Sequence, residues 1–555
     1  MMKLLSKTQS ATELVEDINS NLQDMSSQVE VAVTDSATSL ASELNTALGV
    51  NTLDADDDAE TFITALNTAF ENAVASSWPS IIPEFNPTKY GAEMDDTMGE
   101  VNKLKNNADF IMLVSTDIHY EKQKTVSVNK NGTTYQVPLM NGTGISDHSD
   151  TFTPMMSNHC EFLRRAKVNG IKVDAIVNLG DFFDGRRTAY TSGGVEIMSA
   201  EERVAEYLKS MTHPYKALSN AYNVPLIFAL GNHDDNYDEQ YGWCPASFDT
   251  LYNWFLKDTV DPKNKSTNEG GTAYSGGLDY YIDFDSAKIR VVVIFCQEGL
   301  GTTGGAYYSS TKTANNWTIP TASYNYLVSC VNSLPEGYKV FLLGHTHPVM
   351  SRGAEGGTNL LMDYLEEHSD TIIGYICGHA HTDWVRGYPI ASISHVCGLQ
   401  TGWRDDDDLW SVIAIKKGNG LDGLIHLIRF GQNGAWAYKD ANNVWHCDQS
   451  GNYKIHYNPI IGTVGETITL VPSISNVTNW YMDATSWCGF TAPSAATGVT
   501  TKTASGYASY QAANDNSSCE VTINARDASY PQIICVRAKN ADTCEYWFIK
   551  IPKTT

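Results

Sequence analysis

The chain has 555 residues, which is too long for one ordinary domain and predicts about three. Its 64 acidic and 38 basic residues give a net charge of −26 at pH 7, which argues against general binding to nucleic-acid backbones, because phosphate attracts basic surfaces. None of the 11 cysteines forms a C-x-x-C pair, so a zinc site built on thiolates is not expected.

Residues 1–78 are predicted to be a helical, coiled-coil-like region. They contain no apolar core or cleavage site typical of a secretory signal peptide, and no run in the chain is long enough to cross a bilayer. Apolar residues recur at heptad-like spacing at Val15, Ile18, Leu22, Met25 and Val29. A single helix cannot bury this stripe, so residues 10–48 are expected to self-associate or to dock on a partner. A helical hairpin that folds back on the following domain is the alternative.

Residues 79–104 are predicted to be an extended linker. The segment WPSIIPEFNPTKYG, at 78–91, contains three prolines, and proline interrupts helices. Such a linker would leave few contacts between the helical region and the domain predicted at 105–440.

In that next domain, five short apolar runs each end on Asp, Asn or His. They are LVSTDIHY at 113–120, VDAIVNLGDFFDG at 173–185, VPLIFALGNHDD at 224–235, YKVFLLGHTHP at 338–348 and IIGYICGHAH at 372–381. Such runs are typical of strands buried on both faces, and functional residues gather at the carboxyl ends of these strands. We therefore expect carboxylates, an amide and imidazoles to meet at one rim.

In this order, the motifs D-x-H, G-D-x-x-D, G-N-H-D, G-H and G-H-x-H resemble those of the calcineurin-like metallophosphoesterases, over roughly residues 105–435. The resemblance implies the α/β fold of that family, a four-layer α/β/β/α sandwich, and hydrolysis of phosphate esters. It also implies two divalent or trivalent metal ions. Oxygen and imidazole ligands without thiolate suit Mn, Fe or Zn, and Mn is favoured.

The resemblance also assigns the metal ligands by position. It implies that one ion is bound by Asp117, His119 and His381, that the other is bound by Asn232, His345 and His379, and that Asp181 bridges both. A bridging carboxylate holds two cations close together by offsetting their mutual repulsion.

Four further residues receive roles outside the ligand set. His233 resembles the family histidine that stabilises developing charge or protonates the leaving oxygen, a task that suits imidazole near neutral pH. Asp184 resembles the carboxylate that orients this histidine. Arg186 lies one residue beyond the usual position of a phosphate-binding arginine, and His347 is expected to face the substrate.

Residues 455–555 are predicted to be an all-β, immunoglobulin-like sandwich. The segments VGETITLVPSISNVTNWYMD, SCEVTINARD and YPQIICVRAKNADTCEYWFIKI alternate apolar and polar residues between turn clusters. They contain no catalytic combination of residues.

The helical region, the metallophosphoesterase-like domain and the immunoglobulin-like sandwich together resemble bacteriophage tail and baseplate proteins in architecture. The leading hypothesis is a metallophosphoesterase that hydrolyses phosphodiesters, in a phage virion acting on a bacterial surface polymer such as teichoic acid. One alternative is a structural or receptor-binding virion protein in which the phosphoesterase domain is only a scaffold. The other is a cytoplasmic bacterial phosphoesterase for small phosphate esters. No membrane partner is expected.

Overall fold

The structure is a computed structural model that describes the chain between residues 78 and 552, with gaps. The described residues are 78–120, 124–139, 152–183, 187–231, 233–234, 236, 248–266, 278–295, 321–346, 357–379, 384–387, 390–394, 410–430, 436–439, 445–447, 452–483, 487–488, 502–504, 508–525 and 532–552. The helical region predicted at the amino terminus lies outside them. The chain divides into two compact units.

The described part of the first unit is helical. It contains α4 (Pro87–Leu104) and parts of α5 (Phe152–Val168) and α6 (Ala200–Tyr222). Glu161 accepts hydrogen bonds from Arg164 and Arg165, and Arg165 also pairs with Asp95 of α4.

Helix α4 corrects the prediction that residues 79–104 form an extended linker. Asn86 caps the helix by accepting a hydrogen bond from the N–H of Lys89 at 3.1 Å. Pro87 occupies the first helical position, where its missing N–H is not needed and its fixed φ suits the helix. Met94 and Val101 then bury one face. Proline disrupts the interior of a helix, but here it begins one.

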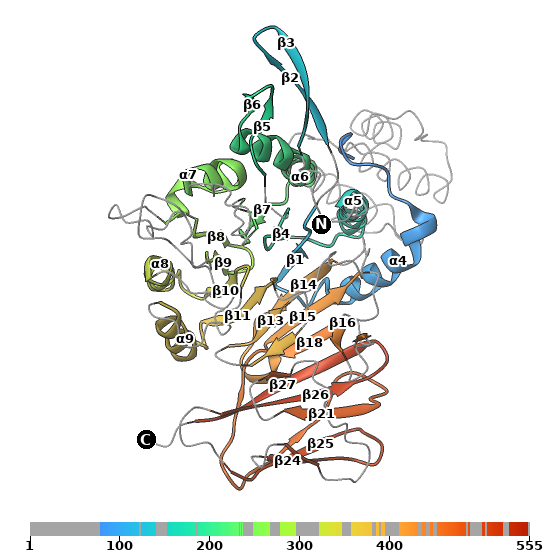
Figure 1. The fold of residues 1–555 in the computed structure, drawn as a ribbon. Helices are drawn as coiled ribbons and strands as arrows, with labels where there is room; N and C mark the ends of the chain where they lie inside the picture. Colours follow the sequence, from blue (N-terminus) through green and yellow to red (C-terminus); the bar gives the residue numbers. More distant parts are fainter. Residues whose placement is uncertain are drawn as a thin grey trace, which may run out of the picture. The chain divides into compact units, whose positions relative to one another are not determined.

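The second unit contains the larger of two mixed sheets, which has ten strands. Its main path runs β21 (Asn479–Asp483), β26 (Gln532–Lys539), β27 (Thr543–Ile551), β18 (Asn452–His456), β15 (Leu424–Arg429), β14 (Ser411–Lys416), β1 (Phe110–Ser115), β4 (Ala175–Asn178) and β7 (Leu226–Phe228), with β19 (Ile460–Ile461) beside β27. Figure 1 shows β1, β14, β15, β18 and β27 following one another in this sheet.

The other large sheet has seven strands and faces the first. Its order is β22 (Trp487–Cys488), β12 (Trp384–Arg386), β13 (Ser392–Ser394), β11 (Ile372–Cys377), β10 (Lys339–Leu343), β9 (Ile289–Val293) and β8 (Tyr280–Phe284). The rings of Phe110 and Phe284 meet edge to face at 4.7 Å between the sheets. A Cβ on Gly374 would lie 2.8 Å from Ile425, so the sheets approach closely there. The expected mixed α/β class is confirmed.

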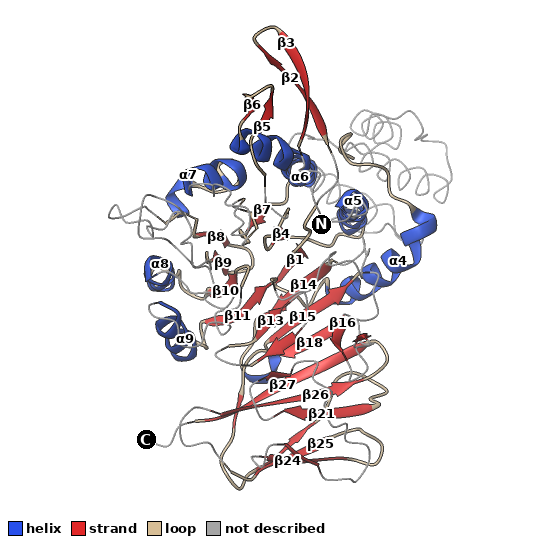
Figure 2. Ribbon diagram, viewed as in Figure 1, coloured by secondary structure: helices blue, strands red, loops and turns tan. Residues whose placement is uncertain are grey.

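Helices α8 (Thr321–Asn332) and α9 (Gly357–Glu367) flank the seven-stranded sheet (Figure 2). Arg290 of β9 donates to the carbonyl of Cys330 in α8, and Tyr324 of α8 meets Tyr364 of α9 at 5.8 Å. The remaining elements are the hairpins β2 (Thr125–Lys130)–β3 (Thr133–Pro138), β5 (Tyr190–Ser192)–β6 (Val195–Met198) and β16 (Trp436–Lys439)–β17 (Trp445–Cys447), and the short helices α7 (Phe248–Leu251), η1 (Tyr252–Leu256), η2 (Pro262–Asn264) and η4 (Gly420–Asp422). Among the described helices, none is long and apolar enough to cross a membrane.

The carboxyl-terminal strands are not the separate module predicted at 455–555. Strand β18 pairs antiparallel with β15 and parallel with β27, so one sheet continues through the predicted boundary. Strand β22 also joins the seven-stranded sheet beside β12. Sequence alternation identifies strands, but it does not say which sheet they extend. The immunoglobulin-like assignment stays a prediction.

A second sheet covers these carboxyl-terminal strands. It is formed by β20 (Thr467–Leu470), β25 (Cys519–Ile523), β24 (Ala508–Ala512) and β23 (Lys502–Ala504). Its inward residues share one apolar core with those of β21, β26 and β27, and Trp480 stacks on Trp547 inside it at 5.6 Å.

A buried carboxylate ties β27 to β18. Glu545 accepts hydrogen bonds from Nε2 of His456 at 2.8 Å and from the N–H groups of Ser473 and Ile474, at 2.8 and 3.1 Å. Burial raises the pKa of Glu545, but the bond from His456 and the charge of Lys454 outweigh burial and lower this pKa from 4.5 to about 2. Glu545 therefore stabilises the fold above pH 4.5, and the stabilisation is lost as the pH falls toward 2.

We predict that Glu545→Gln lowers the free energy of unfolding at pH 7 by roughly 3 kcal/mol, because each pKa unit corresponds to about 1.4 kcal/mol. Urea unfolding at pH 7 and pH 3 measures this, and the difference from wild type should shrink at pH 3. Glu520→Gln, at an exposed position of β25, is the control and should change stability by less than about 0.5 kcal/mol. Equal effects of the two variants would contradict the assignment.

Candidate metal centre

Strands from both sheets of the second unit end at one group of side chains. The parallel strands β1, β4 and β7 lead to Asp117, Asp181 and His233. The parallel strands β10 and β11 of the facing sheet lead to His345 and His379. The rim expected from the sequence is therefore built from the carboxyl ends of strands in two sheets.

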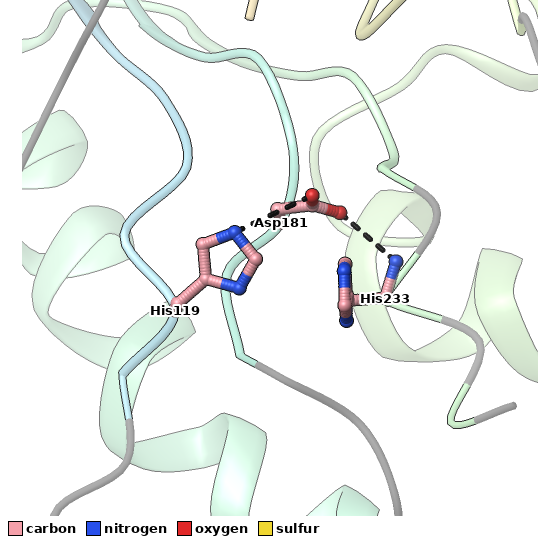
Figure 3. A group of neighbouring side chains, drawn as sticks. All are labelled: His119, Asp181 and His233. Carbon is pink, nitrogen blue, oxygen red and sulfur yellow. Dashed lines mark hydrogen bonds and ion pairs between the residues drawn. The ribbon is translucent and has the colours of Figure 1, made fainter. Parts of the chain in front are cut away.

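The carboxylate of Asp181 lies at the middle of the group. Its Oδ2 is 3.0 Å from Nε2 of His345 and 3.5 Å from Nε2 of His119, and its Oδ1 accepts the backbone N–H of His233 at 2.9 Å. Figure 3 shows this carboxylate between the imidazole of His119 and the backbone nitrogen of His233. Asp181, His119 and His345 are each at most 2% exposed.

The imidazoles form two pairs around this carboxylate. The rings of His119 and His233 meet edge to face at 4.8 Å, and those of His345 and His379 at 5.3 Å. Possible ligand atoms of His119, Asp181 and His233 lie within 4.8 Å of one another, and so do those of Asp181, His345 and His379. Both groups share Asp181, as a bridging ligand requires.

Asp117 is held by donors from two strand ends. Both of its oxygens lie 3.0 Å from the N–H of His379, and Oδ2 also accepts the hydroxyl of Thr116 at 2.7 Å. Its Oδ1 lies 3.9 Å from Nε2 of His345. Thr116, which received no role from the sequence, thus helps to orient a predicted ligand.

The tautomer of His345 follows from its neighbours. Nδ1 lies 2.8 Å from the carbonyl of Leu179, which can only accept, so Nδ1 carries a hydrogen and Nε2 points toward Asp181. Burial lowers the pKa of His345, but Asp181 and Asp117 outweigh burial and raise this pKa to about 9. Burial likewise raises the pKa of Asp181, while the charges of His345 and His233 hold it well below its ordinary value.

The family profile of the calcineurin-like phosphoesterases matches residues 112–383, which include all of these side chains. Residues 112–383 are a calcineurin-like phosphoesterase domain. The expected family membership is thereby confirmed for this part of the chain.

Other comparisons add little. No curated protein matches the chain. Among solved structures, an endo-fucoidan hydrolase from glycoside hydrolase family 107 shares 10% identity at a TM-score of 0.14. The alignment covers 73% of this chain and 59% of the fucoidan hydrolase, so this chain spans less than two thirds of the length of that protein. A likeness this slight carries no argument about fold or function.

The backbone of the phosphoesterase domain is left-handed at four of the candidate ligands. The values of φ are 49° at Asp117, 43° at His119, 53° at Asp181 and 66° at His379. Such backbone is costly for residues other than glycine and persists where the surroundings enforce it. Here the N–H of Asp117 donates to the carbonyl of Gly180 and the N–H of His119 to that of Asp181, each at 2.9 Å.

Glycines allow the ligand loops to approach each other. A Cβ on Gly231 would lie 2.1 Å from Oδ1 and 2.4 Å from the backbone nitrogen of Asp181. A Cβ on Gly378 would lie 2.1 Å from the hydroxyl of Thr116 and 2.2 Å from Oδ2 of Asp117. The glycines seen in the motifs therefore leave room for the two carboxylates.

The structure brings six of the predicted site residues together, and the other five lie outside the described residues. The six are Asp117, His119, Asp181, His233, His345 and His379. Asn232, Asp184, Arg186, His347 and His381 lie outside the described residues. Sequence reasoning left Asp234 without a role, although it follows His233 in the motif and is fully buried.

We predict that Gly231→Ala displaces Asp181 and lowers the affinity for metal at least about tenfold, because the new methyl group needs the space of the carboxylate. Metal content after dialysis against graded Mn²⁺ measures this effect. Gly99→Ala in α4, where nothing lies within 4 Å of the new Cβ, is the control and should bind metal as wild type does. A Gly231→Ala variant with unchanged affinity would contradict the close approach.

Proposed function

We propose that the phosphoesterase domain is a binuclear metal-dependent hydrolase of phosphate esters, with phosphodiesters as the preferred class. The observation that carries this proposal is the position of one buried carboxylate between two pairs of imidazoles, in a domain of the calcineurin-like phosphoesterase family. The sequence order of the five motifs supports the same reading.

The described side chains fit a pair of metal ions. The carboxylate of Asp181 and two imidazoles converge within 4.8 Å in each of two groups, and no thiol belongs to either group. Nε2 of His345 is directed into the cluster by the carbonyl of Leu179, which is a common arrangement for a ligating histidine. This donor set suits Mn, Fe or Zn, and Mn remains the favoured ion. Such ions, when bound, polarise phosphate oxygens and lower the pKa of water.

The protein residues have separate tasks in this proposal. Asp181 bridges the two ion positions and offsets their repulsion, while Asp117 and His119 serve one position and His345 and His379 the other. Asn232 and His381 complete the two ligand sets. These assignments combine the family resemblance with the observed proximity of the described residues.

His233 is proposed to act on the reacting group from outside the ligand sets. Its backbone N–H is held by Asp181, and its ring stands against that of His119. An imidazole there can donate a proton to the leaving oxygen, and Asp184 is proposed to orient this imidazole. Because the ring also lies within ligand reach of His119 and Asp181, metal content must be measured alongside activity.

The biological setting is proposed from the sequence alone. We infer a virion enzyme that acts on a bacterial surface polymer such as teichoic acid, assembled through self-association of residues 10–48. Those residues lie outside the described part of the chain, as do Arg186 and His347, the proposed substrate contacts. A scaffold-only domain would hydrolyse no phosphate ester, and a cytoplasmic enzyme for small esters would act without oligomer formation.

We predict that Asp181→Asn removes most activity toward bis(p-nitrophenyl) phosphate and lowers occupancy of both ions. Asparagine tolerates the left-handed backbone at φ 53°, so the change removes the charge without new strain. Asp279→Asn is the control, since Asp279 is equally buried but accepts the N–H of Phe295 instead of facing imidazoles. If Asp181→Asn keeps near-normal turnover with two ions per chain, the bridging role is wrong.

We predict that His233→Ala retains both ions and loses about 10²- to 10⁴-fold in turnover, the usual contribution of general acid–base catalysis. The loss should be smaller for nitrophenolate, which leaves without a proton, than for an alkoxide. His213→Ala, at an exposed position of α6, should leave turnover unchanged. Equal losses for good and poor leaving groups would rule out proton donation, and loss of one ion would make His233 a ligand.

A further inference from the structure

Two loops that carry candidate site residues are joined by an unusual set of hydrogen bonds. The loop after β4 carries Asp181, and the loop after β7 carries His233. Besides the bond from the N–H of His233 to Asp181, four bonds between described residues link these loops through the side chains of Asp234 and Asn236. Neither of these residues has a role in the chemistry proposed above.

Both carboxylate oxygens of Asp234 accept hydrogen bonds from backbone N–H groups. Oδ2 accepts the N–H of Asp181 at 2.9 Å and that of Gly231 at 2.7 Å, while Oδ1 accepts the N–H of Phe182 at 2.8 Å. The side chain is fully buried. It therefore forms hydrogen bonds with the peptide groups on both sides of Asp181 and links them to its own loop.

Asn236 forms hydrogen bonds with Arg187, at the far end of the loop after β4. Its Oδ1 accepts the N–H of Arg187 at 2.6 Å, and its Nδ2 donates to the carbonyl of Arg187 at 2.9 Å. Asn236 is 2% exposed and has a left-handed backbone, with φ at 68°. Because the side-chain amide both accepts from and donates to the backbone of Arg187, it fixes the position and the orientation of that residue.

These bonds lie where small displacements matter most. The Asp181 backbone is itself left-handed, and Gly231 leaves no spare room beside its carboxylate. A shift between the loops would move that carboxylate relative to His119 and His345, from which it is separated by 3.5 and 3.0 Å. Residues that orient metal ligands commonly change affinity about 10- to 100-fold when they are replaced.

We propose that Asp234 and Asn236 are positioning residues that form a clamp between the two loops and set the affinity of both ion sites. The clamp holds the Asp181 carboxylate at a fixed distance from the His233 loop, although neither clamp residue touches an ion or substrate. This inference rests on the proposed binuclear function. The competing explanation is that the two side chains only stabilise the fold.

Asn236→Gly is the decisive variant. Glycine adopts the left-handed backbone without strain, so the change removes both bonds to Arg187 while leaving the loop conformation accessible. Asn516→Gly is its matched control, because Asn516 is also left-handed, at φ 57°, and donates to the carbonyl of Thr478 in the carboxyl-terminal region. Asp234→Asn, paired with Glu545→Gln as the control, tests the other half of the clamp, since an amide cannot accept on both sides.

The measurement is Mn²⁺ binding to the full chain by titration calorimetry and by metal content at graded free Mn²⁺, with thermal unfolding of the metal-free proteins alongside. Asn236→Gly and Asp234→Asn should each bind both Mn²⁺ ions about 10- to 100-fold more weakly. The control variants should bind as wild type, even where their unfolding temperatures fall. Excess Mn²⁺ should restore most of the turnover of Asn236→Gly.

Three results can be told apart. If wild type binds two ions and Asn236→Gly binds them equally tightly, the clamp is wrong while the proposed function stands. If the control variants weaken Mn²⁺ binding as much as the clamp variants, the effect is general destabilisation and the clamp is again wrong. If wild type itself binds no Mn²⁺, Fe or Zn, the binuclear proposal fails before the clamp is reached.

Discussion

A buried carboxylate among imidazoles is the constraint on which the rest of the domain depends. Asp181 is 1% exposed, and isolating its charge from water would be costly without partners of opposite charge. The charges of His345 and His233, and to a smaller extent that of His119, lower the pKa of Asp181 and act as such partners, and a pair of cations would supply stronger ones. At this position Asp181 has a left-handed backbone, and Gly231 leaves room for its carboxylate. Gly378 leaves room in the same way for the neighbouring carboxylate of Asp117.

The six site residues that meet in the described part of the chain could be named in advance because their signals are local. Each ligand follows an apolar strand within a few residues, and most also follow a glycine, so Asp117, Asp181 and His345 could be named from the sequence. Roles that act through tertiary contacts could not be named. Nothing near Thr116 or Asn236 in the sequence says that one bonds to Asp117 and the other to the backbone of Arg187.

The fold class could be predicted from the sequence, but the pairing of distant strands could not. Residues 79–104 were predicted to be an extended linker because proline interrupts helices, whereas Pro87, capped by Asn86, begins one. The carboxyl-terminal strands were recognised by alternation, yet their partners are distant in sequence. Strand β27 pairs with β18, and β22 pairs with β12, which follows the histidine motif that contains His379. Gly387, just after β12, would clash with Phe548 of β27 if it carried a Cβ. The carboxyl-terminal region is thus part of the framework that holds the centre.

The central claim is that Asp181 bridges two metal ions. Crystals of the chain grown with Mn²⁺, with diffraction recorded on both sides of the manganese absorption edge, test it most directly. We expect two anomalous peaks on either side of the Asp181 carboxylate, about 3.5–4 Å apart, with His345 and His379 beside one and His119 beside the other. A single peak, or peaks that leave Asp181 uncoordinated while ions bind elsewhere, would contradict this account of the centre.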